Sequence, residues 1–325
     1  MSRLHNFIVN KLWYGQSLVR FLLIPFSFLF ALVVAIRRYA YRIGLLKSSK
    51  PDVPVIVVGN ITVGGTGKTQ TVLAIVDYLL KKGFKPGIIT RGFGGKTHEP
   101  TLVDDDSDVA RVGDEAYLLY QRSKCPVSVG SDRVACAHQL VLHRSCDVIV
   151  SDDGLQHYGL KRDIEVVLID GDRGLGNGYL LPAGPLRELP RRLREATLVL
   201  SKHKPHALAE AHFTVSPNHW VNLKDGSEEP LNDFAYQDVQ ALAGIANPQA
   251  FFDTLTGLGL RHTAHSFPDH AAFEPQHLAF ASDLPLVMTE KDAVKCRAWA
   301  CADWWYLKVD ADMPAVLWTV LEEKL

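Results

Sequence analysis

The sequence has few cysteines and no excess of charge of either sign. Its five cysteines are an odd number and none forms a C-x-x-C pair, so a disulfide framework and a structural zinc site are both disfavoured. Lys and Arg total 35 against 36 Asp and Glu, and the net charge of −1 lacks the basic footprint of a nucleic-acid-binding protein. We therefore expect free, buried thiols in a reducing compartment and no nucleic-acid partner.

The rest of the composition is that of an ordinary globular protein. Hydrophobic residues make up 47% of the 325 residues and charged residues 22%, which excludes a largely disordered chain, a collagen and a coiled coil. A chain of this length predicts about two domains. It is long enough to bury a sizeable core and to form a cleft between two lobes.

One apolar run near the N-terminus departs from this average. Residues 21–36 carry no charge and are bracketed by Arg20 and Arg37. The run is shorter than the ~20 residues that span a bilayer as a helix, but apolar residues at 12–19 lengthen it, because Arg20 can extend its charged end toward the interface. We predict a membrane-associated helix within residues 1–40 that spans the bilayer or lies in its interface.

Two other interpretations of this run stay open. A cleaved signal peptide is disfavoured because basic residues continue after the run, from Arg37 to Lys50, and no clear cleavage site precedes them. A buried core helix is the second alternative. For a membrane-bound run, the basic flank indicates that the rest of the chain lies on the cytoplasmic side.

The following sequence alternates strand and helix patterns, which predicts a doubly wound, mainly parallel sheet. Over 41–212 we expect a phosphate-loop domain, and over 213–325 linker strands and a smaller α/β domain. The loose pattern around 203–235 indicates a linker. Strands are expected at 53–58, 86–90, 126–129, 147–151, 164–169, 197–201, 241–245, 263–267, 286–289 and 304–309, and helices at 72–80, 115–121, 133–143 and 248–258.

The strongest chemical signal is the glycine-rich loop after the first of these strands. The pattern G-x-x-x-x-G-K-[ST] is met at Gly67, Lys68 and Thr69, whereas Thr62 takes the place of the first glycine. Glycines let backbone N–H groups turn toward phosphate oxygens, and the following helix adds its positive dipole. Lys68 would reach the β- and γ-phosphates and Thr69 would bind Mg²⁺. The predicted nucleotide residues are Thr62, Gly64, Gly65, Thr66, Gly67, Lys68 and Thr69. The alternative is a glycine turn with an exposed lysine.

A second signal is the acidic end of the strand at 147–151. Asp152 and Asp153 follow this apolar run directly. Phosphate-loop enzymes hold their metal with a carboxylate from a neighbouring strand, so either aspartate is a candidate Mg²⁺ ligand, directly or through water. The alternative is a solvated turn.

Three further clusters have a structural explanation when each is taken alone. Asp114 stands before an apolar helix, where capping is the default role of an aspartate. His270 follows a predicted strand, where a lone histidine is more often structural. The stiff turn at 182–188 leads into Arg191, Arg192 and Arg194, which predict a solvated helix face or a phosphate clamp.

Taken together, the motifs indicate a function more specifically than any one of them does alone. In chain order these motifs stand at 59–69, 90–94, 113–115, 151–157, 180–188, 267–270 and 289–292. In this order, over nearly the whole chain, the sequence resembles the tetraacyldisaccharide 4′-kinase (lipid A 4′-kinase) family. Thr62 is usual for this family, and Gln70 stands where the family more often has proline.

The resemblance implies an ATP- and Mg²⁺-dependent kinase. Its acceptor would be the 4′-hydroxyl of tetraacyldisaccharide 1-phosphate, an acylated glucosamine disaccharide, and its product lipid IVA. The enzyme would work at the cytoplasmic face of the inner membrane in contact with its lipid, and no protein partner is implied.

The resemblance also implies roles for individual residues. Asp114 would act as the base that accepts the hydroxyl proton, paired with His270, while Lys68 takes part in phosphate transfer. Asp152 and Asp153 carry over as the metal and nucleotide carboxylates. At the rim of the nucleotide site the family pattern places Arg187 and Glu188.

Two functions from other classes stay open at this point. A membrane-associated phosphate-loop ATPase acting as a switch or delivery factor would account for the loop and the anchor, but not for Asp114 with His270. A soluble nucleotide-binding module would leave the N-terminal run as core. A lipid requirement for nucleotide turnover separates the first from a kinase, and release by salt alone would identify the second.

Overall fold

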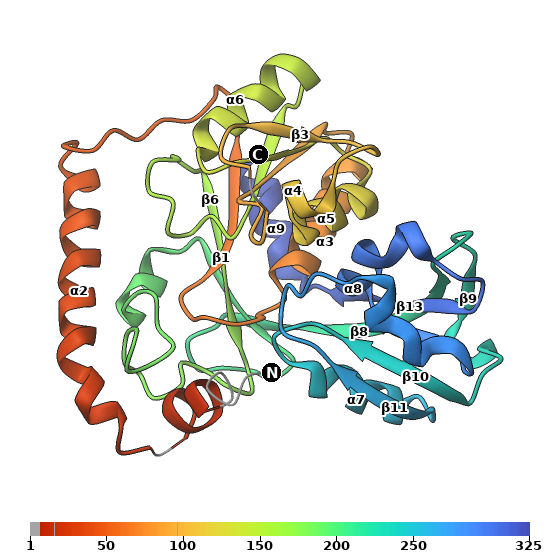
Figure 1. The fold of residues 1–325 in the computed structure, drawn as a ribbon. Helices are drawn as coiled ribbons and strands as arrows, with labels where there is room; N and C mark the ends of the chain where they lie inside the picture. The colour runs from red at the N-terminus through yellow and green to blue at the C-terminus, as the bar shows by residue number, and fades with distance from the viewer. Residues whose placement is uncertain (1–6, 16, 96) are drawn as a thin grey trace.

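The protein forms one continuous sheet with helices around it. The computed structural model describes residues 7–15, 17–95 and 97–325. Thirteen strands within these residues have the order β11-β10-β12-β13-β8-β7-β6-β1-β5-β2-β4-β3, with β9 paired to β8. Figure 1 shows the helices packed around the sheet and α2 standing apart at one side. The predicted mainly parallel, doubly wound sheet is confirmed.

β1 (Val55–Asn60) is the centre of the first half of the sheet. It runs parallel to both β5 (Val148–Asp152) and β6 (Ile164–Asp170), and all of its residues are buried. A strand covered by helices on both faces exposes neither to water, which explains its continuous apolar run. The other elements of this half are α3 (Lys68–Lys81), β2 (Pro86–Thr90), β3 (Thr101–Val103), α4 (Val109–Val112), α5 (Asp114–Ser123), β4 (Val127–Val129), α6 (Arg133–Arg144), η2 (Pro190–Glu195) and β7 (Leu198–Lys202).

The second half of the sheet forms the predicted smaller α/β lobe. β10 (Asp238–Ala243) is parallel to β11 (Arg261–Ser266) and β12 (Leu286–Thr289), and β12 is parallel to β13 (Trp304–Asp312). Its core contains stacked aromatic rings, such as those of Trp220 and Phe234. The remaining elements are η3 (Leu231–Asp233), α7 (Pro248–Gly257), η4 (Pro275–Ser282), α8 (Glu290–Cys296) and η5 (Arg297–Trp299).

The segment 203–235, where a linker is expected, contains a long strand in place of a loop. β8 (Ala211–Asn222) pairs parallel to β7 at its start and antiparallel to β13 along the rest, and β9 (Glu228–Pro230) pairs with it. Polar residues and Pro217 give this segment the pattern of a loop. Pro217 has no N–H for the ladder, and the register with β13 shifts beside it, between Lys308 and Val309. β8 thereby joins the two halves into one sheet.

The C-terminal helix returns to the first half of the sheet. α9 (Ala315–Lys324) buries Leu317 and Leu321 in the same hydrophobic cluster as Val72 of α3. Trp318 stacks on Tyr78, with 4.5 Å between the ring centroids. The division at 41–212 and 213–325 stays a prediction, and α9 packs across its boundary.

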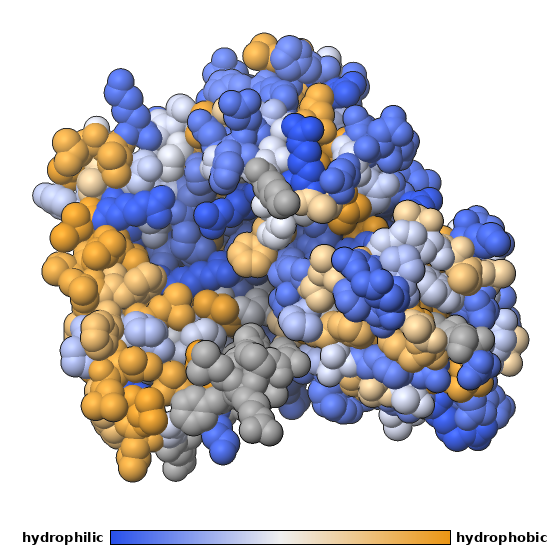
Figure 2. Space-filling model, viewed as in Figure 1, coloured by the Kyte–Doolittle hydropathy of each residue, from blue (hydrophilic) through white to orange (hydrophobic). Residues whose placement is uncertain are grey.

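α2 (Arg20–Arg42) is an apolar helix that is largely exposed. Only Ser27 and Ala40 are buried, so the interpretation as a core helix is wrong. Figure 2 shows a hydrophobic band along α2. Among the residues that the structure describes, α2 is the one helix long and apolar enough to cross a membrane. Its exposed apolar side chains recur at helical spacing and include Leu22, Phe26, Leu29, Val33 and Ile36.

A short polar contact fixes α2 to the body of the protein. The Ser27 hydroxyl donates to the Leu180 carbonyl at 2.6 Å and accepts from the Ala183 N–H at 3.1 Å. Before this helix, in η1 (Phe7–Trp13), the Trp13 indole donates to the Pro182 carbonyl at 3.0 Å. The loop around Pro182 therefore holds α2 to the body of the protein.

The thiols agree with the sequence prediction except at one position. All five cysteines are free. Four of them are buried, whereas Cys301 is exposed. Desolvation raises the pKa of the Cys125 thiol to about 11, so it stays protonated at neutral pH.

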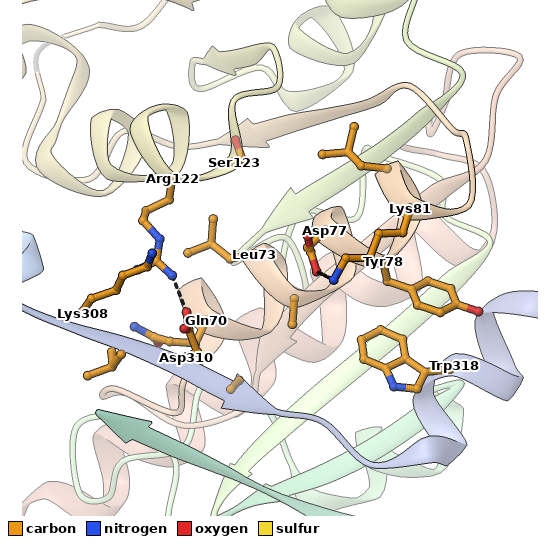
Figure 3. Close-up of a pocket in the computed structure, with 14 residues that line it drawn as sticks. Gln70, Leu73, Asp77, Tyr78, Lys81, Arg122, Ser123, Lys308, Asp310 and Trp318 are labelled. Carbon is orange, nitrogen blue, oxygen red and sulfur yellow. Dashed lines mark hydrogen bonds and ion pairs between the residues drawn. The ribbon is translucent and has the colours of Figure 1, made fainter. Parts of the chain in front are cut away.

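An ion cluster joins the two halves beside a cavity of about 620 Å³ between α3, α5 and β13 (Figure 3). Arg122, in the last turn of α5, donates to both carboxylate oxygens of Glu290 in α8, at 2.7 and 2.6 Å. It also pairs with Asp310 of β13. Because Glu290 is buried, its charge depends on Arg122.

Replacing Arg122 by methionine leaves the Glu290 carboxylate buried without its cation. Since breaking a buried ion pair costs about 3 kcal/mol or more, we expect the thermal midpoint of unfolding to fall by about 5 °C. Lys81→Met is the matched control: it removes an exposed pair with Asp77 and should shift the midpoint by less than about 1 °C. Equal midpoints for the two variants would show that the cluster does not hold the halves together.

Candidate active site

The predicted phosphate loop lies between β1 and α3 and is shaped by glycine backbone conformations. Gly64 and Gly67 have φ of 125° and 85°, and a Cβ at Gly67 would lie 3.1 Å from the Phe213 ring. Asn60 holds the loop from inside: its side-chain amide donates to the Gly64 carbonyl at 3.3 Å and to the Thr66 hydroxyl at 3.1 Å. The loop ends at the N-terminus of α3, where unpaired backbone N–H groups favour an anion.

Lys68 begins α3 and faces the acidic end of β5. Its ammonium lies 3.7 Å from Asp153 Oδ1 and 3.5 Å from Asn60 Oδ1. Arg187 Nη1 donates to both carboxylate oxygens of Asp153, at 3.1 and 3.0 Å. Burial would raise the pKa of Asp153, but Lys68 and Arg187 outweigh it and lower the pKa. The structure thus brings three predicted site residues into one charge network, with Thr69 half-buried in the next position of α3.

Asp152 is fully buried beside this network. Burial, and after it the nearby charge of Glu115, raises the pKa of Asp152 to about 7. Its Oδ2 accepts a long hydrogen bond from the Thr90 hydroxyl at 3.5 Å, whereas Oδ1 has no hydrogen-bond partner among the described residues. A buried carboxylate oxygen without a hydrogen-bond partner is suited to binding a cation.

Arg133 is a site residue that the sequence motifs did not indicate. It lies in the first turn of α6, 3% exposed, and Nη2 donates to the Asp152 carbonyl at 3.1 Å. Its Nη1 has no partner among the described residues. The only sequence signal was a basic residue directly after the capping Asp132.

Asp114 and His270 meet across the two halves of the protein. His270 Nδ1 lies 3.0 and 3.1 Å from the two carboxylate oxygens of Asp114. Asp114 opens α5 but its cap position is Gly113, and His270 follows β11 with a φ of 58°. Burial would raise the pKa of Asp114, but the hydrogen bond from His270 and the charge of Lys291 hold the pKa below its ordinary value. Asp114 therefore carries a negative charge at neutral pH.

Two groups of side chains lie at one edge of the sheet: the charge network around Asp153 and the Asp114–His270 pair. The phosphate loop, the loop 91–95 and Asp153 follow the parallel strands β1, β2 and β5. Phe93 of the middle loop lies against His270, with 4.7 Å between the ring centroids. A Cβ at Gly94 would lie 3.4 Å from His270 Nδ1. The loop 91–95 is therefore in contact with the Asp114–His270 pair, as expected at the carboxyl ends of parallel strands.

Glu188 and Arg192 are directed into the body of the protein, whereas Arg191 and Arg194 are exposed. Glu188 is 1% exposed and accepts from Gln156 Nε2 at 3.0 Å and from the Tyr158 hydroxyl at 2.6 Å. Arg192 is buried and donates to both carboxylate oxygens of Glu165, at 2.5 and 2.7 Å. The prediction of a solvated face or phosphate clamp is therefore wrong for Arg192, because its charge is already paired. A nucleotide role for Glu188 stays a prediction.

Comparisons with known proteins identify the same family as the sequence motifs. The family model of tetraacyldisaccharide-1-P 4′-kinase matches residues 19–325. A tetraacyldisaccharide 4′-kinase from Nitrosococcus oceani is 45% identical over 312 residues, which cover 96% of this chain and 92% of the relative. One from a Shewanella strain is 47% identical over 308 residues, with 94% and 91% coverage.

A solved structure is similar over the same length. It is that of LpxK from Aquifex aeolicus in complex with ATP, which is 28% identical, has a TM-score of 0.80, and is matched over 94% of this chain and 99% of its own. Family model, relatives and fold therefore agree over nearly the whole sequence. The chain belongs to the tetraacyldisaccharide-1-P 4′-kinase family.

Proposed function

We propose that this kinase transfers the γ-phosphate of ATP to the 4′-hydroxyl of tetraacyldisaccharide 1-phosphate and forms lipid IVA. The observation that carries the proposal is the Asp114–His270 pair at the same sheet edge as the phosphate loop. A nucleotide switch needs only the loop, whereas phosphate transfer to a hydroxyl also needs a group that accepts its proton.

ATP fits the loop that starts α3. Backbone N–H groups of the glycine loop and the ammonium of Lys68 would contact the phosphates. Lys68 now faces Asp153 at 3.7 Å, so its charge is already held at this edge. The ATP named with the Aquifex aeolicus structure supports the same ligand here.

Mg²⁺ fits the same edge as a shared ligand of protein and nucleotide. Among the described residues no group of three or more His, Cys, Asp or Glu side chains could hold a metal by itself. Mg²⁺ commonly takes one or two carboxylates plus substrate phosphates, and the unpartnered Asp152 Oδ1 fits that role. Thr69, Asp152 and Asp153 would hold the ion, which when bound neutralises charge on the β- and γ-phosphates.

This placement gives each side chain near the phosphate loop a role in phosphate transfer. Asp114, ionised and 5% exposed, accepts the proton of the 4′-hydroxyl as the sugar oxygen forms its bond to the γ-phosphorus. The bond from that phosphorus to the bridging oxygen breaks, and ADP leaves with the electron pair. His270 orients the carboxylate, and Lys68 balances charge on the transferred phosphoryl group.

The anchor explains how the enzyme reaches such a substrate. An acylated disaccharide stays in the bilayer, so the active site must work at the membrane surface. The exposed apolar side of α2 would enter the membrane, and the basic residues at its end, such as Arg37 and Arg42, would meet anionic lipid. This arrangement supports an enzyme at the cytoplasmic face of the inner membrane.

The proposal is tested with γ-labelled ATP, Mg²⁺ and detergent-dispersed tetraacyldisaccharide 1-phosphate. Label should appear on the lipid with wild-type protein and fall by at least about 100-fold with Asp114→Asn, which keeps the shape but removes the base. The matched control is Asp106→Asn at an exposed aspartate, with unchanged transfer. ATP hydrolysis without labelled lipid would contradict the proposal and favour a switch or delivery ATPase.

Lys68→Met should lower phosphate transfer by about 100–1,000-fold, because charge stabilisation of the transferred group is lost. The thermal midpoint of unfolding should stay within about 2 °C of wild type, since Lys68 makes only long contacts. Lys81→Met, on the same helix, should transfer phosphate normally. Turnover by Lys68→Met at the control's rate would remove the phosphate loop from the mechanism.

The membrane role of α2 is tested by charge on its exposed side. Leu29→Lys with Val33→Lys should move the protein from the membrane pellet to the soluble fraction, because each lysine in hydrocarbon costs about 3 kcal/mol. Leu142→Lys places a lysine at an equally exposed leucine of α6 and should stay with the membrane. A double variant that still sediments with the membrane would place the attachment surface elsewhere.

A further inference from the structure

The chain directly before α2 is bound to the body of the protein. The Asn177 side-chain amide donates to the Leu12 carbonyl at 3.1 Å, and the Asn177 N–H donates to the Trp13 carbonyl at 3.0 Å. The Arg173 guanidinium lies over the Tyr14 ring, 5.4 Å from its centroid. Both partners belong to the segment between β6 and η2. The start of α2 is therefore held at the body.

The last turns of α2 are bound to the same body. Arg38 pairs with Glu195 in η2 and lies 3.9 Å from Glu188. The Tyr41 ring lies against the ring of Tyr158, with 5.8 Å between the centroids. The body thus contacts α2 at both of its ends.

Between these ends, one side of α2 packs on the body and the opposite side is exposed. Phe30 and Ala31 pack against a hydrophobic cluster of the body. Leu22, Leu29 and Ile36 are 74%, 60% and 59% exposed, and successive members of this set are about two helical turns apart. They therefore lie on one face of the helix, within the hydrophobic band seen in Figure 2.

These contacts are incompatible with a helix that crosses the bilayer. At about 1.5 Å per residue α2 is about 34 Å long, so a crossing would place its two ends at opposite membrane faces. A body that contacts both ends cannot lie at both faces. Separating α2 from the body would expose the cluster under Phe30 and move the Ser27 hydroxyl into hydrocarbon without its two backbone partners.

We propose that α2 lies in the plane of the cytoplasmic leaflet, with its exposed apolar side in the hydrocarbon and both of its ends at the same membrane face as the active site. The inference rests on the proposed function, in which α2 contacts the membrane. Charge identifies a lipid surface as the occupant of this side. Arg37, Arg42 and Lys47 are exposed at and after the end of the helix, where they meet anionic headgroups.

This orientation brings the acceptor to the level of the active site. An acylated disaccharide in the same leaflet keeps its chains in the hydrocarbon while its sugar lies among the headgroups. Ser27 of α2 is bonded to the loop around Pro182, and the Pro185 carbonyl of that loop accepts from the Val63 N–H of the phosphate loop. The nucleotide site is therefore held at a constant height above the plane of α2.

The inference is tested by the depth of spin labels along α2. Leu22→Cys, Leu29→Cys and Ile36→Cys are made in full-length protein that also carries Cys301→Ser, because Cys301 is the exposed thiol. The labelled proteins are bound to vesicles of phosphatidylethanolamine and phosphatidylglycerol, and relaxation by oxygen and by a water-soluble nickel chelate gives the depth. All three labels should lie equally deep, about 5–10 Å below the headgroups. A crossing helix would place the label at 29 about 10 Å deeper than the other two.

The matched control for depth is Leu142→Cys, at an equally exposed leucine of α6. Because α6 belongs to the body, a spin label at this position should be in water. Its relaxation by the nickel chelate sets the value for zero depth.

A membrane-impermeant maleimide gives the side of the membrane on which each end of α2 lies. Lys11→Cys stands before the helix and Lys47→Cys after it, and Lys81→Cys on α3 reports the side of the body; all three lysines are exposed. The background again carries Cys301→Ser. In membrane vesicles that expose the cytoplasmic face all three should be labelled to the same extent. In vesicles of the opposite orientation none should be labelled.

Several outcomes would overturn the inference. These are label at position 11 only from the opposite face or from neither face, and a depth that is greatest at 29. Low accessibility of all three spin labels to both relaxing agents would also contradict it and place a protein on this side of α2. Labels in water at all three positions would show that α2 does not contact the membrane at all. Failure of the proposed phosphate transfer is distinguishable, since it would leave depth and sidedness unchanged.

Discussion

The active site depends on one constraint, that parallel strands end at the same edge of a sheet. β1, β2 and β5 are mutually parallel neighbours, so the loops that follow them converge. The phosphate loop, the loop 91–95 and Asp153 are thereby placed together although they are far apart in sequence. Helices that begin at the same edge, such as α3 and α5, point their N-termini toward it. An anion is favoured there before any side chain contributes.

The ionisation of the buried carboxylates at this edge depends on the cations beside them. Asp114 stays ionised because the hydrogen bond from His270 and the charge of Lys291 outweigh the cost of burial. Lys68 and Arg187 do the same for Asp153. Asp152 has less compensation, and its raised pKa and unpartnered oxygen are consistent with a cation held in common with a nucleotide.

α2 is joined to the phosphate loop by a short series of hydrogen bonds. Ser27 of α2 holds the loop around Pro182, as described above. That loop donates from the Arg187 N–H to the Ile61 carbonyl at 2.7 Å and accepts at the Pro185 carbonyl from the Val63 N–H at 2.8 Å. α2 and the phosphate loop are thus held in a fixed relation, which suits the proposed acceptor in the bilayer.

The sequence by itself determined the elements whose signals are local. The phosphate loop is contiguous, β1 is apolar on both faces, and the run at 21–36 is apolar throughout. Motif order also indicated Asp114 and His270, but only through resemblance to a family. Backbone conformation and burial follow such local patterns closely.

The tertiary structure alone decided the contacts between distant segments. β8 is a strand only because β7 and β13 pair with its polar, proline-containing sequence. Arg133, outside every motif, reaches Asp152. Lys291 lies in the motif at 289–292, but its contacts with His270 and Glu115 form only in the folded chain. Glu188 is turned inward by Gln156 and Tyr158. The physical reason is that charges and strands far apart in the sequence pair only when the chain packs. The periodicity of neighbouring residues does not specify which distant segments will meet.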